Sequence, residues 1–164
     1  MKTSQKGIDL IKSFESIHDG DLKMPGLQPK MDPSKIWTEG WGRAMRDAKG
    51  NFLRGESNRQ LAYSRATIKT LKEADAALEE DLKTREFDVF RKLKISVNQN
   101  QFDALVSHYY NTGGSSTLFD LINKKAGRAV IYKWFTERYI TSDGVVLNGL
   151  IRRRKAEADL FFAK

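Results

Sequence analysis

The sequence predicts an α+β fold that is mostly helical, with a small β-rich lobe and a larger helical lobe. All three prolines and six of the twelve glycines fall within residues 17–58, and such residues interrupt long helices. From about residue 60 onward, apolar side chains recur at helical spacing. We therefore expect a single domain over residues 1–164. Residues 17–58 would form the small lobe, and residues 1–16 and 59–164 the helical part.

Residues 4–16 are predicted to form the first helix. Ser4 is a residue type that favours the N-cap position. Ile8 and Ile11 then recur at helical spacing, and Glu15 closes the run. A carboxylate at the end of a helix that packs by its apolar face is held rigidly, which suits a general acid.

Within the small lobe, short strands are expected at residues 36–41 and 52–53, with a turn at 47–50. Thr70 and Glu73 then form a capping-box pattern that opens a long helix ending near Leu93. Its apolar stripe is Ala74, Leu78, Leu82 and Val89.

The clearest helix follows Asn98, a good N-cap residue. Its apolar side chains follow the i, i+3, i+4, i+7, i+8 pattern. These side chains are Phe102, Leu105, Val106, Tyr109 and Tyr110. Gly113 and Gly114 are expected to end it.

The sequence after Gly114 predicts three further helices. A short one begins at Ser115 or Ser116 and stops near residue 127. Another covers 128–140, with inward-facing side chains at Ile131, Trp134 and Phe135. A turn at 142–144 leads to a last, basic helix over 150–162.

Composition narrows the class of protein. Hydrophobic residues make up 40% and charged residues 30% of the sequence, as in globular domains. The sequence has no cysteine, so no disulfide framework or thiol chemistry is expected. No apolar run reaches the length of a secretory signal, a signal anchor or a membrane span. The net charge of +8 favours polyanionic partners, which include both nucleic acids and bacterial cell walls.

The residues that carry chemistry are Glu15 and the stretch from Asp32 to Gly42, which reads DPSKIWTEGWG. Asp32 starts a turn at an Asp-Pro pair, and Thr38 follows six residues later. Two carboxylates and a hydroxyl on separate elements, with tryptophans between them, suit the hydrolysis of a glycosidic bond.

These motifs resemble the phage-type lysozymes, the muramidase endolysins of glycoside hydrolase family 24. The resemblance continues in NQFDALV from Asn100, YNTGGSSTL from Tyr110 and GLIRRRKAE from Gly149. It covers nearly the whole chain and implies a two-lobed lysozyme-like fold, in which the long helix bridges the lobes. It also implies that Glu15 is the general acid, and that Asp32 and Thr38 position or activate water.

Two departures from the family pattern stand out. Glu15 and Asp32 are 17 positions apart, farther than is usual in the family, so Asp19 and Asp21 compete with Asp32 for its role. We choose Asp32 because of its offset from Thr38. The family's glycine-flanked motif also ends in His where this chain has Arg43. We expect that change to alter hydrogen bonding more than chemistry.

Four further residues are assigned supporting roles. Trp37 and Trp41 are predicted to line the substrate groove, although core packing is the alternative for either. Asn111 is predicted to bind a sugar amide, with helix-end hydrogen bonding as the alternative. The resemblance implies that an Arg of the last helix pairs with Glu15, and Arg153 is chosen from Arg152–Arg154. The simplest reading of these three arginines is a solvated helix face.

The predicted reaction is hydrolysis of the β-1,4 bond between N-acetylmuramic acid and N-acetylglucosamine in bacterial peptidoglycan. No cofactor and no metal site are expected, and His18 and His108 read as ordinary polar residues. We expect a monomer with no nucleic-acid partner and no stable membrane insertion. The resemblance implies a holin-like factor that releases it from the host cytoplasm to the wall. A lytic transglycosylase and a non-catalytic basic binder of wall glycan or nucleic acid are the alternatives.

Overall fold

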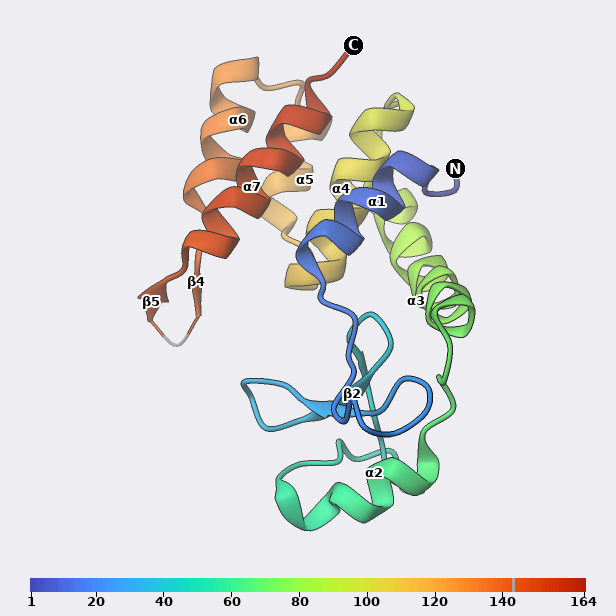
Figure 1. The fold of residues 1–164 in the computed structure, drawn as a ribbon. Helices are drawn as coiled ribbons and strands as arrows, with labels where there is room; N and C mark the ends of the chain where they lie inside the picture. The colour runs from blue at the N-terminus through green and yellow to red at the C-terminus, as the bar shows by residue number, and fades with distance from the viewer. Residues whose placement is uncertain (143) are drawn as a thin grey trace. The chain divides into compact units, whose positions relative to one another are not determined.

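In the computed structural model, which describes residues 1–142 and 144–164, the chain divides into two compact units. One unit holds residues 15–81, and the other holds residues 1–14 with 82–164. Short antiparallel strands lie in both, and helices make up most of the second (Figure 1). The predicted α+β class, mostly helical with a small β-rich part, is confirmed.

The unit of residues 15–81 is built on a three-stranded antiparallel sheet in the order β1-β2-β3. Its strands are β1 (Lys30–Met31), β2 (Trp37–Glu39) and β3 (Arg43–Ala44). The central strand lies within the predicted segment 36–41. The predicted strand at 52–53 is reduced to a single bridge between Arg46 and Phe52. The turn at 47–50 is confirmed, since the Gly50 amide donates to the Asp47 carbonyl at 3.1 Å.

The core of this unit explains why it extends beyond residue 58. Trp37, Met45 and Leu53 are buried together with Ala62. Ala62 lies on α2 (Arg59–Arg65), which follows the short 3-10 helix η1 (Glu56–Asn58). Burial of these apolar side chains makes α2 part of the smaller unit, because the three short strands alone enclose too little apolar surface.

The long helix α3 runs from Leu71 to Lys92 and begins with the predicted capping box. The Thr70 hydroxyl accepts from the Glu73 amide at 3.2 Å, and the Glu73 carboxylate accepts from the Thr70 amide at 2.9 Å. These two bonds satisfy backbone donors that an uncapped helix leaves open. The predicted stripe of Ala74, Leu78, Leu82 and Val89 is buried.

The other unit is centred on α4 (Gln99–Thr112), which packs against α1 (Gln5–Phe14) and α7 (Asn148–Phe161) (Figure 1). The Asn98–Gln101 capping box opens α4, and Gly113 ends it with φ at +76°. Every side chain from Phe102 to His108 is buried. The predicted periodic stripe is therefore part of a helix that is covered on most of its circumference.

Buried Asp103 of α4 fixes the start of α1. Its carboxylate accepts hydrogen bonds from the Ser4 amide, at 2.9 Å, and from the Ser4 hydroxyl. The Ser4 hydroxyl in turn accepts from the Gly7 amide at 3.4 Å, the N-cap contact that the sequence predicted. Gly7 is required here because a Cβ would lie 2.8 Å from Asp103.

After α4 come α5 (Ser116–Asn123), α6 (Arg128–Glu137) and α7. The chain between α6 and α7 forms a small hairpin of β4 (Thr141–Ser142) and β5 (Val145–Val146), which the sequence did not predict. The turn predicted there includes Asp143, which lies outside the described residues. Among the described residues, no helix combines the length and apolar character needed to cross a membrane.

Candidate active site

Glu15 directly follows the last residue of α1 and opens the smaller unit. The segment after it is fixed to the end of the sheet, because the His18 amide donates to the Gly40 carbonyl at 2.8 Å. This pairing brings Glu15 beside the glycine-rich turn after β2. The Glu15 Oε2 atom lies 3.6 Å from the position that a Cβ at Gly42 would occupy. Gly42 has φ at +97°, a conformation that favours glycine.

Asp32 lies in the turn between β1 and β2. Its Oδ1 accepts from the Ile36 amide at 2.8 Å, and its own amide donates to the Ile36 carbonyl at 2.8 Å. Lys35 completes the turn in the left-handed region, with φ at +62°. One carboxylate oxygen therefore orders the turn. In the part of the chain that the structure describes, the other accepts no hydrogen bond.

Thr38 lies at the centre of β2 and is 4% exposed. It faces Lys30 of β1, and its hydroxyl donates to the Lys30 carbonyl at 2.8 Å. The hydroxyl proton is therefore committed to the sheet, and only the oxygen lone pairs are free to receive a further donor. The sheet thus fixes the Thr38 oxygen on the strand that leads to the glycine turn beside Glu15.

The competing carboxylates, Asp19 and Asp21, belong to the long loop that precedes β1. Asp19 Oδ1 accepts from the amides of Asp21 and Gln28 at 3.4 and 3.3 Å. Asp21 Oδ1 accepts from the Lys23 amide at 3.0 Å. All three aspartates therefore order loops. Asp32 alone directly follows the strand that pairs with the Thr38 strand, and its assignment remains a prediction.

The prediction that Trp37 lines a substrate groove was wrong. Its side chain is 4% exposed and lies edge-on to Tyr63, with ring centroids 6.0 Å apart. The indole nitrogen donates to the Gly55 carbonyl at 2.8 Å. A ring buried in this way has no face to offer to a sugar. Trp41 is partly exposed, and its indole nitrogen donates to Asp75 Oδ1 at 2.7 Å, so its groove role remains a prediction.

Two charged residues of the DPSKIWTEGWGR stretch have structural roles instead. Buried Glu39 accepts from the amides of Thr67 and Ile68, at 2.9 and 3.1 Å, and thereby fixes the approach to α3. Arg43 forms two hydrogen bonds with Asp81, at 2.9 and 2.8 Å. These partners could not be predicted from the sequence, because they lie 28 or more residues away.

Contrary to the prediction of a solvated helix face, two of the three arginines of α7 are buried in the larger unit. Arg153 and Arg154 are 3% and 0% exposed, and both approach Glu157. Arg153 Nη2 also donates to the Ser107 carbonyl at 3.4 Å, and its guanidinium lies 5.7 Å from the centroid of the Phe14 ring. Arg152 alone of the three is exposed. The pairing of Arg153 with Glu15 stays a prediction of the family resemblance.

Burial changes the pKa values of Glu157 and Arg154. Desolvation raises the pKa of Glu157, against the opposing effect of Arg154 and Arg153. Desolvation also lowers the pKa of Arg154. Arg154 Nη2 donates to Asn111 Oδ1 at 3.0 Å. Exposed Asn111 therefore uses one lone pair of its side-chain oxygen within the protein, and its predicted contact with a sugar stays a prediction.

The sequence matches the phage lysozyme family over residues 23–157, a range that includes Asp32, Thr38 and Arg153 and begins after Glu15. The endolysin of Bacillus phage PZA is 37% identical over 98% of this chain. The endolysin of Lactococcus phage c2 is 31% identical over the same share. The chain spans 55% and 60% of the length of these two relatives.

Solved structures give the same picture of the fold. The muramidase domain of SpmX from Asticaccaulis excentricus matches with a TM-score of 0.74 and 27% identity, over 99% of both chains. The endolysin from Escherichia coli O157:H7 phage FAHEc1 matches with a TM-score of 0.73 and 28% identity, over 99% of this chain and 94% of that one. The predicted lysozyme-like fold is thus confirmed. Because the family match covers most of its length, the chain belongs to the phage lysozyme family.

Proposed function

We propose that the chain degrades bacterial peptidoglycan as a muramidase, by hydrolysis of the β-1,4 bond between N-acetylmuramic acid and N-acetylglucosamine. The observation that carries this proposal is the position of Glu15 against Gly42, on the turn that continues the Thr38 strand. The names of its relatives, endolysins and a muramidase domain, support the same activity.

Glu15 would act as the general acid. Cleavage of a glycosidic bond leaves an alkoxide-like oxygen, which departs far more readily when a carboxylic acid protonates it. The backbone around Glu15 is fixed at both ends, by α1 before it and by the His18–Gly40 pairing after it. A fixed backbone limits the positions that the Glu15 carboxyl can reach, which favours proton transfer to one position.

Asp32 would orient the attacking water or stabilise positive charge on the sugar ring. Its Oδ2 accepts no hydrogen bond from the residues that the structure describes, whereas Oδ1 holds the carboxyl in place through Ile36. Thr38 would accept a hydrogen bond from that water, since its own proton is donated to Lys30. Overall, the glycosidic bond breaks, one product takes the water hydroxyl at its anomeric carbon, and the other takes a proton.

The test is a mass analysis of the products from purified peptidoglycan. Hydrolysis gives reducing ends that are one water heavier than the anhydro ends of a transglycosylase, and a binding protein gives no product. Glu15→Gln should fold normally and lose nearly all activity, because glutamine has the shape of Glu15 but no proton to donate. Anhydro products from the parent chain, or full activity in the Glu15→Gln variant, would overturn the proposal.

The choice of Asp32 is tested by three matched substitutions. Asp32→Asn should severely reduce wall clearing, because it removes the negative charge that orients water or balances the ring cation. Asp19→Asn and Asp21→Asn should stay near the parental rate, since we assign them only to loop order. Circular dichroism shows whether each variant is folded. If Asp32→Asn clears walls normally and one of the other two does not, the second carboxylate is that other residue.

A further inference from the structure

The outer surface of the smaller unit carries two arginines beside one exposed aromatic ring. Met45 and Leu53 are buried in the core of this unit, and the Leu53 amide donates to the Met45 carbonyl at 3.0 Å. Side chains alternate across extended chains, so the neighbouring Arg46, Phe52 and Arg54 point away from that core. All three side chains are exposed. We call these three residues the outer patch.

Phe52 brings the two guanidinium groups of the outer patch together. The Cζ atoms of Arg46 and Arg54 lie 3.8 and 5.8 Å from the centroid of its ring, so they are no farther apart than the sum of these distances. Backbone carbonyls hold them as well. Arg46 Nη1 donates to the Gly50 carbonyl at 2.7 Å, and Arg54 Nη1 donates to the Ser34 carbonyl at 3.3 Å. Side chains that are restrained in this way lose less entropy when they bind a ligand.

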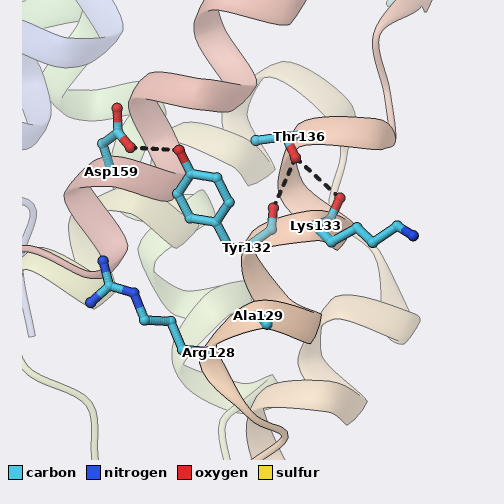
Figure 2. Close-up of a pocket in the computed structure, with 6 residues that line it drawn as sticks. All are labelled: Arg128, Ala129, Tyr132, Lys133, Thr136 and Asp159. Carbon is cyan, nitrogen blue, oxygen red and sulfur yellow. Dashed lines mark hydrogen bonds between the residues drawn. The ribbon is translucent and has the colours of Figure 1, made fainter.

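The charges of the outer patch have no carboxylate partner. Among the described residues, neither Arg46 nor Arg54 forms an ion pair, and their Nε and Nη2 atoms form no hydrogen bond. Exposed Lys155 of α7, by contrast, lies 2.6 Å from Asp159 Oδ2. Figure 2 shows that the other oxygen of this carboxylate accepts from the Tyr132 hydroxyl, at 2.8 Å. The guanidinium donors of the outer patch are therefore left for an anion from outside the chain.

The segment around the outer patch is also basic. Residues 46–54 hold two arginines and Lys49 against a single carboxylate, Asp47. That carboxylate orders the turn, because its Oδ1 accepts from the Lys49 amide at 2.8 Å. The next carboxylate along the chain, Glu56, is paired with Arg59 at 3.2 Å. The surface thus keeps an excess of positive charge, which favours a polymer of anions over a single one.

The stacking of Arg46 selects among polyanions. Single-stranded nucleic acids bind proteins by stacking their bases on open aromatic rings. In the outer patch, the Arg46 guanidinium lies directly over the Phe52 ring and occupies the place of a base. The ring therefore supports the charges and is not a platform for bases. Guanidinium donors match phosphate oxygens, so the surface fits a phosphodiester chain that has no bases.

We propose that the outer patch binds a polyol phosphate, the kind of phosphodiester polymer that is attached to peptidoglycan in many bacterial walls. Arg46 and Arg54 would contact its phosphates, with Phe52 as their support. That such a polymer meets this chain at a wall rests on the proposed function. The residues of the outer patch take no part in the chemistry assigned to Glu15, Asp32 and Thr38, so the patch would hold the chain on the wall without changing the cleavage step.

The test is a calorimetric titration of the full chain with soluble poly(glycerol phosphate). The parent chain should bind it, and the double variant Arg46→Gln/Arg54→Gln should bind about tenfold more weakly or less, because two phosphate contacts are lost. Phe52→Leu keeps both charges but removes their support, so it should also weaken binding. An oligonucleotide with the same number of phosphates should bind more weakly than the polyol phosphate. Equal or tighter binding of the oligonucleotide would overturn the choice of ligand.

Arg91→Gln/Lys92→Gln is the matched control. It removes two exposed positive charges from the larger unit, and Arg91 also lies over a phenyl ring, 5.5 Å from the Phe87 centroid. This variant should bind as the parent does. If it loses as much affinity as Arg46→Gln/Arg54→Gln, or if Phe52→Leu binds normally, only the net charge matters and the outer patch is not a site. Peptidoglycan cleavage without polymer binding refutes this inference alone, and polymer binding without cleavage refutes the proposed function alone.

Discussion

At the scale of single residues, Thr38 is assigned two roles, one in the sheet and one in catalysis, that two measurements can distinguish. Thr38→Val keeps the shape of the side chain but leaves the Lys30 carbonyl without its donor. We expect a loss of roughly 1–2 kcal/mol in the free energy of unfolding and a strong loss of wall clearing. Thr38→Ser keeps the hydroxyl and should retain most of both.

Denaturant unfolding and wall-clearing rate measure these two effects independently, at a temperature where every variant is folded. If Thr38→Val clears walls at the parental rate, Thr38 stabilises the sheet and does not contact the attacking water.

His108 makes the stability of the chain depend on pH. The side chain is 1% exposed, and its ring lies 5.4–5.7 Å from those of Trp134, Phe135 and Tyr139. Burial, and then the charges of Arg154 and Arg153, lower the pKa of His108 from 6.5 to about 3. The folded state therefore keeps a neutral imidazole at pH values where the unfolded chain binds a proton.

The sign of the effect follows from this difference. Above pH 6.5 neither state binds the proton, so proton binding by the unfolded chain does not lower the free energy of unfolding. As the pH falls from 6.5 towards 3, only the unfolded chain binds it, and stability falls by about 1.4 kcal/mol per pH unit. Urea unfolding of the parent and of His108→Phe between pH 7 and pH 4 measures this slope. The variant should show a shallower fall, and identical slopes would refute the prediction.

At the scale of elements, α4 is the helix whose packing the larger unit depends on most. Leu105 lies at its middle and is 1% exposed. Leu105→Ala removes buried methyl groups and leaves a cavity, so we expect a loss of roughly 2–5 kcal/mol in the free energy of unfolding. Phe87→Ala on α3 is the control, because this ring is 58% exposed and should change stability by about 0.5 kcal/mol or less. Similar thermal midpoints for the two variants would show that Leu105 is not a core residue.

At the scale of the whole molecule, the net charge of +8 should affect the rate of wall lysis. A basic protein is attracted to an anionic wall, and salt screens that attraction once the Debye length falls below about 10 Å. Lysis should therefore slow as ionic strength rises above roughly 0.1 M. Thermal midpoints over the same salt range check that unfolding is not the cause. Activity that stays constant would exclude a role for long-range attraction.

The sequence by itself determined the features that depend on neighbours a few residues away. The capping boxes at Thr70–Glu73 and Asn98–Gln101 were predictable because each is closed by hydrogen bonds between positions i and i+3. The buried stripes of α3 and α4 followed from helical periodicity. Glu15, Asp32 and Thr38 could be chosen as candidates because the family motif is local in sequence, and their roles remain predictions.

The tertiary structure alone decided which polar and aromatic side chains are buried, and with which partners. Trp37 lies in the core because Ala62 of α2 covers it, and Arg153 and Arg154 are buried because α4 brings Ser107 and Asn111 to them. The Thr38 hydroxyl donates its hydrogen bond to a backbone carbonyl of the neighbouring strand. Such partners carry no sequence signature, because every residue has a carbonyl and any of several helices can cover an aromatic ring. Only the register of the strands and the packing of the helices select one of them.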